Sequence, residues 1–322
     1  MLSTWLEDRQ IPLYLIALLA GAGFGLLAPT PAAGLEIAIT PVLRLLLYAT
    51  FLSIPLTRLG QVVYEGRFLA GLVVLNFVIV PVVVFALSRF VADHPALSLG
   101  VLFVLLTPCI DYVIVFSGLA GAAHERLLAA APLLMLGQML LLPVYLGLFV
   151  GPELVDVIDI GPFVEAFGLL IVVPLVLAAA TQFLAARARL AQRVMRSFET
   201  LMVPLVMLTL AVVVASQIDA VRIELDQLLR VIPLYVLFLM VMIPLGVLTG
   251  RVFTQDTATT RATVFSGATR NSLVVLPLAL ALPDSLALVA VVVVTQTLVE
   301  LIGMVIYVRL IPRIIPDRAT VR

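Results

Sequence analysis

The segment Ser266-Gly267-Ala268-Thr269-Arg270-Asn271-Ser272 interrupts a long apolar stretch near its middle. An arginine placed at the depth of a membrane costs several kcal/mol unless it faces a cavity or an opposite charge. Arg270 has apolar runs on both sides, so its side chain does not easily extend to a membrane surface, which is the alternative interpretation. We therefore predict that Ser266, Thr269, Arg270 and Asn271 belong to a functional site inside the membrane.

An earlier apolar stretch breaks in the same way, at Thr107-Pro108-Cys109-Ile110-Asp111. Pro108 removes a backbone hydrogen bond from the helix, and the Asp111 carboxyl needs a partner or a proton at this depth. The alternative is a simple proline kink, with Cys109 as a small core residue. Because paired broken helices, one in each half of the chain, are typical of secondary transporters, we predict that Cys109 and Asp111 join the same site.

The composition identifies a membrane protein. Of 322 residues 63% are hydrophobic and only 12% are charged, and the mean hydropathy is +1.23. The net charge is zero, so nothing favours binding to nucleic acid. A single cysteine and two histidines exclude an internal disulfide and the common zinc motifs, and no phosphate-binding glycine loop is present. We predict a polytopic membrane protein that is not an enzyme and needs no cofactor.

The apolar stretches predict an all-α fold with ten transmembrane helices, each about as long as a bilayer requires. Broken spans occupy the fourth and ninth places. The expected spans cover residues 12–28, 37–59, 68–91, 96–119, 126–150, 163–185, 198–217, 229–251, 259–282 and 285–311.

Two sets of five spans indicate a duplication. Residues 1–150 form the first set, 151–162 a linker, and 163–322 the second set. Five is an odd number, so the two sets have opposite orientations in the membrane. The order of weakly similar features, such as Pro81 and Pro244 within the third and eighth spans, agrees between the sets. We therefore predict two inverted five-helix repeats in which broken helices 4 and 9 cross.

The arginines predict the orientation. Cytoplasmic loops of membrane proteins are enriched in basic residues. Three of the 19 arginines (Arg89, Arg222 and Arg230) fall on one side and two (Arg44 and Arg270) fall inside spans. The other fourteen share one side, which predicts that both termini are cytoplasmic; they are Arg9, Arg58, Arg67, Arg126, Arg187, Arg189, Arg193, Arg196, Arg251, Arg261, Arg309, Arg313, Arg318 and Arg322.

Three further polar residues lie within spans. Glu300, in the tenth span, could carry a proton or serve as a fixed partner of Arg270. Gln138 and Gln296 could line a cavity or form hydrogen bonds between helices. We expect Asp111 to pair with Arg270, which would leave Glu300 free to titrate.

The two breaks resemble those of a known superfamily. The sequence CIDYVIVFSGLAGA from Cys109 resembles the fourth-helix signature of arsenite efflux permeases in the bile acid:sodium symporter/arsenite permease superfamily. The sequence GATRNSLVVLPLAL from Gly267 resembles the other broken helix of that superfamily. The stretch Thr297-Leu298-Val299-Glu300 resembles the Leu-x-Glu element of the arsenite branch, which is the branch that the chain resembles most.

The resemblance implies a plasma-membrane transporter with a core domain and a panel domain, each drawn from both repeats. It implies that Cys109 is the essential cysteine that binds the transported arsenite, and that Glu300 is the tenth-helix glutamate. A soft thiol suits trivalent arsenic. The sodium-coupled branch has Glu and Gln as cation ligands where this chain has Ser266 and Arg270, so sodium coupling is not expected.

The function expected from these features is efflux of arsenite or antimonite by proton antiport or uniport. One alternative is an organic-anion symporter that uses Arg270 as the counter-charge. A second is a membrane sensor or scaffold that transports nothing. The expected partners are a small inorganic or organic solute and the lipid bilayer, with homo-oligomerisation left open.

Overall fold

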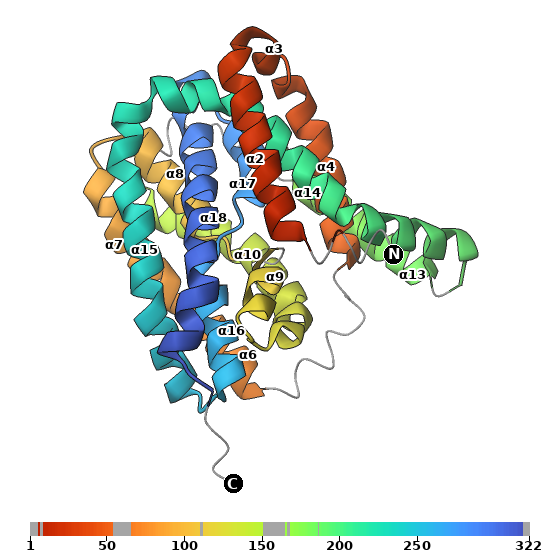
Figure 1. The fold of residues 1–322 in the computed structure, drawn as a ribbon, viewed down its shortest axis with the longest axis vertical. Helices are drawn as coiled ribbons and strands as arrows, with labels where there is room; N and C mark the ends of the chain where they lie inside the picture. Colours follow the sequence, from red (N-terminus) through yellow and green to blue (C-terminus); the bar gives the residue numbers. More distant parts are fainter. Residues whose placement is uncertain are drawn as a thin grey trace.

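Helices are the regular elements of this protein in the computed structural model, which describes residues 6, 9–53, 66–109, 112–150, 165, 168–185 and 187–317. Figure 1 shows their arrangement. In the first half they are α2 (Gln10–Leu27), α3 (Pro29–Ala33), α4 (Glu36–Ser53), α6 (Gly66–Val74), the π-helix η3 (Leu75–Ile79), α7 (Val80–Ser88), the short η4 (Arg89–Val91), α8 (Pro95–Leu105), α9 (Tyr112–Leu119) and α10 (His124–Phe149).

The second half contains the same kinds of element. They are the π-helix η5 (Gly168–Val172), α13 (Val173–Ala185), α14 (Arg189–Ile223), α15 (Leu225–Val252), α16 (Thr257–Ala268), α17 (Ser272–Leu280), the short η6 (Asp284–Leu286) and α18 (Leu288–Ile314).

Both predicted breaks are present. The fourth predicted span is divided between α8 and α9, and the ninth between α16 and α17. Pro108 and the polar segment 269–271 lie in the two interruptions, as expected from the loss of a backbone donor and from side chains that compete for backbone groups.

Five helices of the described residues are long and apolar enough to cross a membrane, or six if the bent α10 counts as one span. The protein is therefore a multi-pass membrane protein. Ten crossings remain a prediction, because α8, α9, α16 and α17 are half-length pieces and α2 and α13 are short. The five helices comprise Glu36–Ser53, Gly66–Val91, Thr200–Ile223, Leu225–Val252 and Leu288–Ile314.

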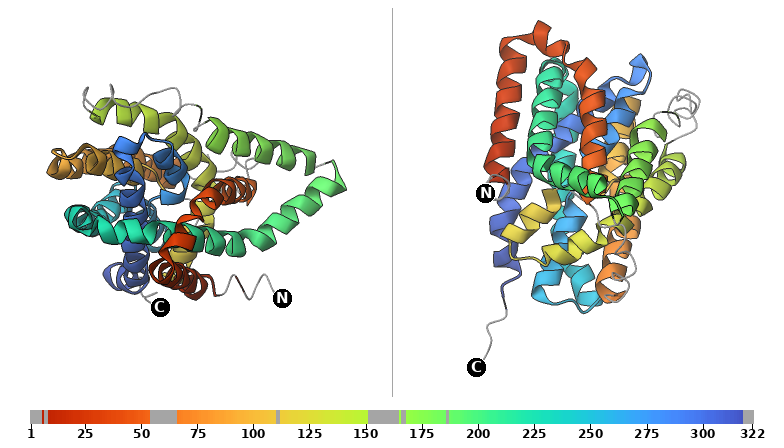
Figure 2. Two further views of the ribbon diagram at one scale, coloured as in Figure 1. Left: turned by 90° about the horizontal axis from the view of Figure 1, so that it is seen from above. Right: turned by 90° about the vertical axis from the view of Figure 1, so that its right-hand side faces the viewer.

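The helices form two groups that pack mainly within themselves. One contains α2, α3, α4, α13 and α14, and we call it the α14 group; the other contains α6 to α10 and α15 to α18, and we call it the crossing group. Helix α4 contacts α17, and α14 contacts α15 and α18, so these contacts join the groups. Helix α13 and the first part of α14 extend to one side as a V (Figure 2).

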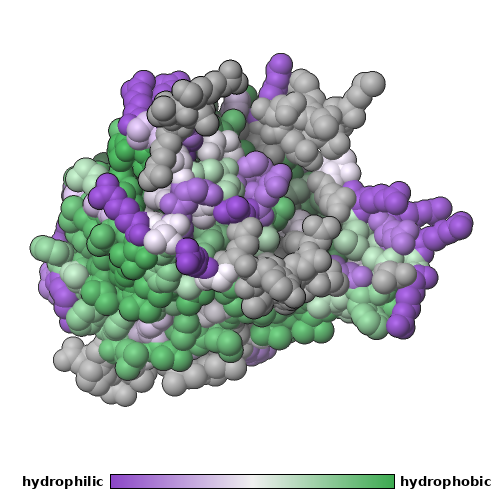
Figure 3. All heavy atoms as spheres, turned by 90° about the horizontal axis from the view of Figure 1, so that it is seen from below, coloured by the Kyte–Doolittle hydropathy of each residue, from purple (hydrophilic) through white to green (hydrophobic). Residues whose placement is uncertain are grey.

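The exterior is largely apolar, as lipid contact requires. Large side chains such as Leu27, Val82 and Leu140 are exposed on the helix surfaces. Hydrophilic side chains gather on the projecting part of the molecule (Figure 3). Arg187, Arg189, Arg193 and Arg196, between the end of α13 and the first turns of α14, are exposed.

One arginine of the predicted cytoplasmic side is buried. We counted Arg261 among the arginines of the cytoplasmic side, at the start of the ninth span, and in the structure it is only 3% exposed within α16. Its guanidinium donates to the carbonyl oxygens of Ala120, Gly121 and Ile315 and pairs with Asp317 at 3.0 Å. A cation there satisfies carbonyl groups at two helix ends.

The predicted linker 151–162 lies outside the described residues.

Candidate functional site

The two helix breaks are joined by backbone hydrogen bonds. The N–H of Cys109 donates to the carbonyl of Thr269 at 3.1 Å, and the N–H of Asn271 donates to that of Thr107 at 2.8 Å. Pro108 and Arg270 thereby form an isolated antiparallel bridge. Backbone groups freed by a broken helix must find partners inside a membrane protein, and here each break supplies them to the other.

Arg270 is completely buried at this junction. Its Nη1 donates to the carbonyl of Leu105 at 3.3 Å, and Nη2 donates at 2.7 Å to the carbonyls of both Ser266 and Gly267. These three carbonyls belong to the last turns of α8 and α16. The prediction that Arg270 stays at depth in the protein instead of reaching the surface is confirmed.

Two more helices complete the environment of the guanidinium. Asn76 Oδ1 accepts from Arg270 Nη2 at 2.9 Å, and the ring of Phe238 in α15 lies 5.5 Å from the guanidinium carbon. Asn76 Nδ2 donates to Ser266 Oγ at 3.0 Å. Asn76 lies in the π-helix η3, an irregularity that is frequent at functional sites. Among the described residues, Arg270 Nε has no hydrogen-bond partner.

Glu300 lies on the opposite side of the bridge, in α18. Its Oε2 accepts from the backbone N–H of Arg270 at 2.9 Å and from Gln296 Nε2. Its Oε1 lies 2.7 Å from the hydroxyl of Tyr112, which is also 3.1 Å from the carbonyl of Arg270. Three donors therefore surround the carboxylate of Glu300, and the expectation that this carboxyl is free to titrate stays a prediction.

The two charges match the helix ends around them. A helix end carries roughly half an elementary charge, negative at the C-terminus. The guanidinium of Arg270 contacts two C-terminal ends, which together amount to about one negative charge. Glu300 accepts from a backbone N–H one residue before Asn271, the N-cap of α17. Arg270 therefore compensates the two helix C-termini as well as the charge of Glu300, and Glu300 compensates the start of α17 as well as the charge of Arg270.

Cys109 is 1% exposed and faces the same cluster. The side chains of Cys109 and Tyr112 both lie close enough to the Arg270 guanidinium to interact with it electrostatically. The thiolate is the form of cysteine that binds metals and metalloids. The position of Cys109 is fixed through its backbone bond to Thr269.

The remaining predicted residues divide into three sets. Ser266, Thr269, Asn271 and Gln296 join the cluster through the bonds described above. Gln138 is buried in α10, and its Oε1 has no partner among the described residues. Asp111 lies outside the described residues, so its expected pairing with Arg270 stays a prediction.

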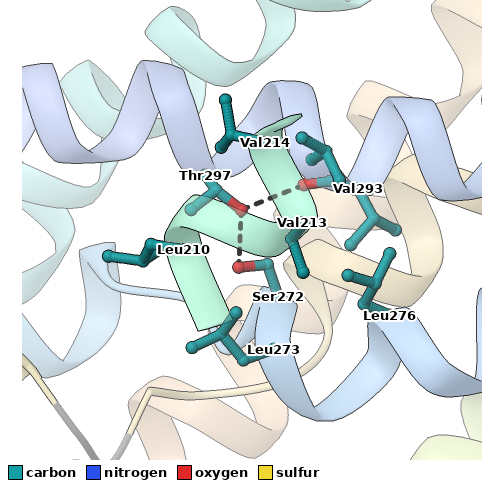
Figure 4. A pocket seen from close by; sticks show the side chains of 9 residues that line it. Leu210, Val213, Val214, Ser272, Leu273, Leu276, Val293 and Thr297 are labelled. Atoms are coloured by element: carbon teal, nitrogen blue, oxygen red, sulfur yellow. Dashed lines mark hydrogen bonds between the residues drawn. The ribbon is translucent and has the colours of Figure 1, made fainter. Parts of the chain in front are cut away.

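A small cavity lies beside the bridge, between the two helix groups (Figure 4). Its volume is about 10 Å³, which suffices for about one water molecule. Thr297 donates to Ser272 at 2.7 Å along its wall. This conformation therefore has no space for a solute here. The lining residues are Leu210, Val213, Val214, Ser272, Leu273, Leu276, Val293, Val294 and Thr297.

The sequence analysis missed Asn76 and Tyr112. Asn76 is an amide within the apolar stretch 68–88, and a buried amide in a membrane span needs a partner, so this signal was available. Tyr112 follows Asp111 directly, but a tyrosine is as often an aromatic packing residue, and only the folded arrangement reveals its contact with Glu300.

An all-helical membrane protein whose broken helices meet at a buried polar cluster has the architecture of a secondary transporter. The model of the Sodium Bile acid symporter family matches residues 40–224, which is more than half of the chain. The chain belongs to this family, whose members are secondary transporters that move small solutes across a lipid bilayer.

The chain is also similar to the Arsenical-resistance protein Acr3 of Corynebacterium glutamicum, with 27% identity over 128 residues. That match covers 37% of this chain and 35% of the length of the relative. The family match confirms the predicted superfamily, and the similarity to this relative points in the direction of its arsenite permease branch.

The family name implies sodium, so the fit of a sodium ion can be tested. In transporters, unwound backbone carbonyls and half-helix C-termini coordinate sodium. Here those carbonyls, of Leu105, Ser266 and Gly267, already accept hydrogen bonds from Arg270. A sodium ion at these oxygens would displace a permanent positive charge or lie beside it. The residues of this cluster therefore do not fit a bound sodium ion.

Proposed function

We propose that this protein exports arsenite or antimonite across the plasma membrane, by proton antiport or as a uniporter. The observation that carries the proposal is the placement of Cys109, the only cysteine of the chain, at the junction of the broken helices beside Arg270. The similarity to an arsenical-resistance protein supports the same solute.

The chemistry of the junction suits a neutral arsenic(III) hydroxide. One thiolate and neighbouring oxygens bind trivalent arsenic reversibly, whereas three thiolates would hold it too tightly for release. Tyr112 and Glu300 supply oxygens close to the bridge. When the Cys109 thiol binds arsenous acid, an As–S bond replaces an As–OH bond, and the thiol proton leaves with the displaced hydroxide as water. Glu300, whose carboxylate contacts the Tyr112 hydroxyl, would relay that proton to the hydroxide and take it back on release of the solute.

Loading of the site requires movement between the helix groups. The cavity between α14 and the pair α17–α18 holds no more than about one water molecule. Leu210, Val213 and Val214 of α14 close it. We propose that separation of the α14 group from the crossing group opens this space to solute. The α14 group would act as the panel domain and the crossing group as the core domain.

The order of helices in the two halves of the chain supports two inverted repeats. In each half a long helix precedes a broken helix, and a second long helix follows it: α6–α7, α8/α9 and α10, then α15, α16/α17 and α18. With the arginine-rich side in the cytoplasm, both termini are cytoplasmic.

An organic anion is a poorer fit to the same residues. The two terminal nitrogens of Arg270 already donate to four oxygen atoms. Only Nε lacks a partner among the described residues, so little donor capacity is left to recognise a carboxylate or sulfonate.

Everted membrane vesicles from an arsenite-permease-deficient host provide the test. Vesicles that contain the protein should accumulate radiolabelled arsenite above empty-vector vesicles, equally in sodium and in choline medium. Accumulation of taurocholate without arsenite would instead favour the organic-anion symporter. If neither solute accumulates in correctly inserted protein, the chain is a sensor or scaffold and the proposal is wrong.

A further inference from the structure

We infer that Arg270 is a tethered cation, whose guanidinium fills an oxygen-lined site that would otherwise bind a free monovalent cation. The inference concerns the ion and not the solute, so it does not depend on arsenite being the cargo. It rests on the acceptors of the guanidinium among the described residues, which are neutral oxygens and include no carboxylate.

The partners of the guanidinium are neutral oxygens. Three are main-chain carbonyls and the fourth is the amide oxygen of Asn76. Several other arginines of the described residues pair with carboxylates, as Arg230 does with both carboxylate oxygens of Asp93. The negative charge of Glu300 attracts the guanidinium of Arg270. In the bonds described, however, Glu300 accepts from the backbone N–H of Arg270 and not from its side chain.

Neutral carbonyl oxygens are the ligands with which membrane proteins replace the hydration shell of a monovalent cation. Here they come from two half-helix C-termini, where positive charge is favourable, and the Phe238 ring adds a face that attracts cations. The guanidinium approaches these oxygens end-on, through its two terminal nitrogens. The surroundings therefore have the properties of a cation site that the chain fills with its own charge.

Two consequences follow. The wild-type protein should be indifferent to sodium, because the guanidinium occupies the oxygens and repels a second cation. Replacement of Arg270 by a small neutral residue should expose the same oxygens and create a requirement for an external cation. Arg270→Lys should fold without sodium, because its ammonium group remains a tethered charge.

The experiment measures the melting temperature of detergent-purified protein without any transported solute. Wild type, Arg270→Ala and Arg270→Lys are each compared in sodium chloride, guanidinium chloride at low millimolar concentration, and N-methylglucamine chloride of equal ionic strength. We expect sodium or guanidinium to raise the melting temperature of Arg270→Ala by several degrees in a saturable manner. Wild type and Arg270→Lys should not respond.

Arg261→Ala is the matched control. Arg261 also caps carbonyl groups of two helix ends, but it adjoins the exposed Asp317, so water can hydrate those carbonyls after truncation. We expect it to lower the melting temperature equally in all three media.

The inference is overturned if Arg270→Ala melts alike in all media or folds in none of them. A saturable effect of sodium on the wild type also overturns it, and that measurement needs no variant. Arsenite transport enters none of these measurements, so failure here is distinct from failure of the proposed solute.

Discussion

The backbone N–H of Cys109 donates to the carbonyl oxygen of Thr269 at 3.1 Å, so residues 160 positions apart hold each other at the meeting point of two broken helices. This bond is made by the backbone N–H of Cys109 and does not depend on the identity of its side chain. The side chain can therefore be changed without loss of the bridge, and this makes Cys109 a clean position for mutagenesis.

Cys109→Ser should reduce arsenite accumulation in everted vesicles to the level of empty vesicles, with an unchanged amount of folded protein. Serine has nearly the same size but is a hard oxygen ligand with little affinity for trivalent arsenic. Ser117→Ala is the control, because Ser117 is buried in the same half of the chain and bonds only to its own helix in the contacts described. Undiminished transport by Cys109→Ser would reduce Cys109 to a packing residue.

Glu300→Gln should fold, whereas Glu300→Leu should not be stable. An amide oxygen can still accept from the Arg270 N–H and from Gln296, and the Tyr112 hydroxyl can turn toward the Arg270 carbonyl at 3.1 Å. Leucine would strand three buried donors at about 1–3 kcal/mol each. Thermal unfolding separates the two variants.

Transport by Glu300→Gln should also lose its dependence on pH, and an unaltered pH profile would exclude Glu300 as the proton carrier.

Asn76→Leu should destabilise the protein by about 1–3 kcal/mol, because a guanidinium acceptor and a donor to Ser266 are both lost. Asn76→Asp should be better tolerated, since its carboxylate still accepts from Arg270. Thr209→Val is a suitable control: Thr209 is equally buried but bonds to the carbonyl of Leu205 in its own helix. Equal melting temperatures for Asn76→Leu and the wild type would remove Asn76 from the site.

Asp256 should contribute stability that depends on pH, through the N-terminus of α16. Partial burial raises the pKa of Asp256, but hydrogen bonds from Thr259 and the charge of Arg126 outweigh it, and the pKa is lowered from 3.8. The residue lines an open cleft of about 500 Å³, so solvent protons reach it. The contribution is therefore complete above pH 4 and is lost as the pH falls through the lowered value.

Asp256→Ala should accordingly cost about 1 kcal/mol at neutral pH, as is usual for loss of an N-cap. Asp256→Asn should retain most of the cap while its stability no longer changes with pH in the acidic range through this group. Thermal unfolding between pH 3 and pH 7 measures both. A wild-type profile identical to that of Asp256→Asn would contradict the assignment.

Reporter fusions test the orientation. Fusions of a cytoplasm-active and a periplasm-active reporter to each end should show both termini in the cytoplasm, because fourteen of 19 arginines fall on that side. Opposite locations of the two ends would require an odd number of crossings. That result would exclude ten spans and the inverted repeat together.

The sequence predicted the places where the helices break, because proline and clustered polar residues act locally on the backbone. It also predicted that Arg270 stays buried, because its apolar flanks are too long for the side chain to pass. The partners of Arg270 were not predictable, since they are carbonyls that any residue carries, and their positions depend on how four half-helices meet. The partners of Arg261 were unpredictable for the same reason: a count of charges by side cannot distinguish a solvated arginine from one that caps buried helix ends.

The shared location of Arg270 and Glu300 has an electrical consequence. Both lie in the crossing group, so any displacement of that group across the membrane moves both side chains together. With Glu300 ionised the pair carries no net charge, and voltage does no work on it. With Glu300 protonated the guanidinium is uncompensated, and each full crossing is worth about 2.3 kcal/mol per 100 mV. The membrane potential would thus act on the proton-loaded form alone and give the proton exchange a direction.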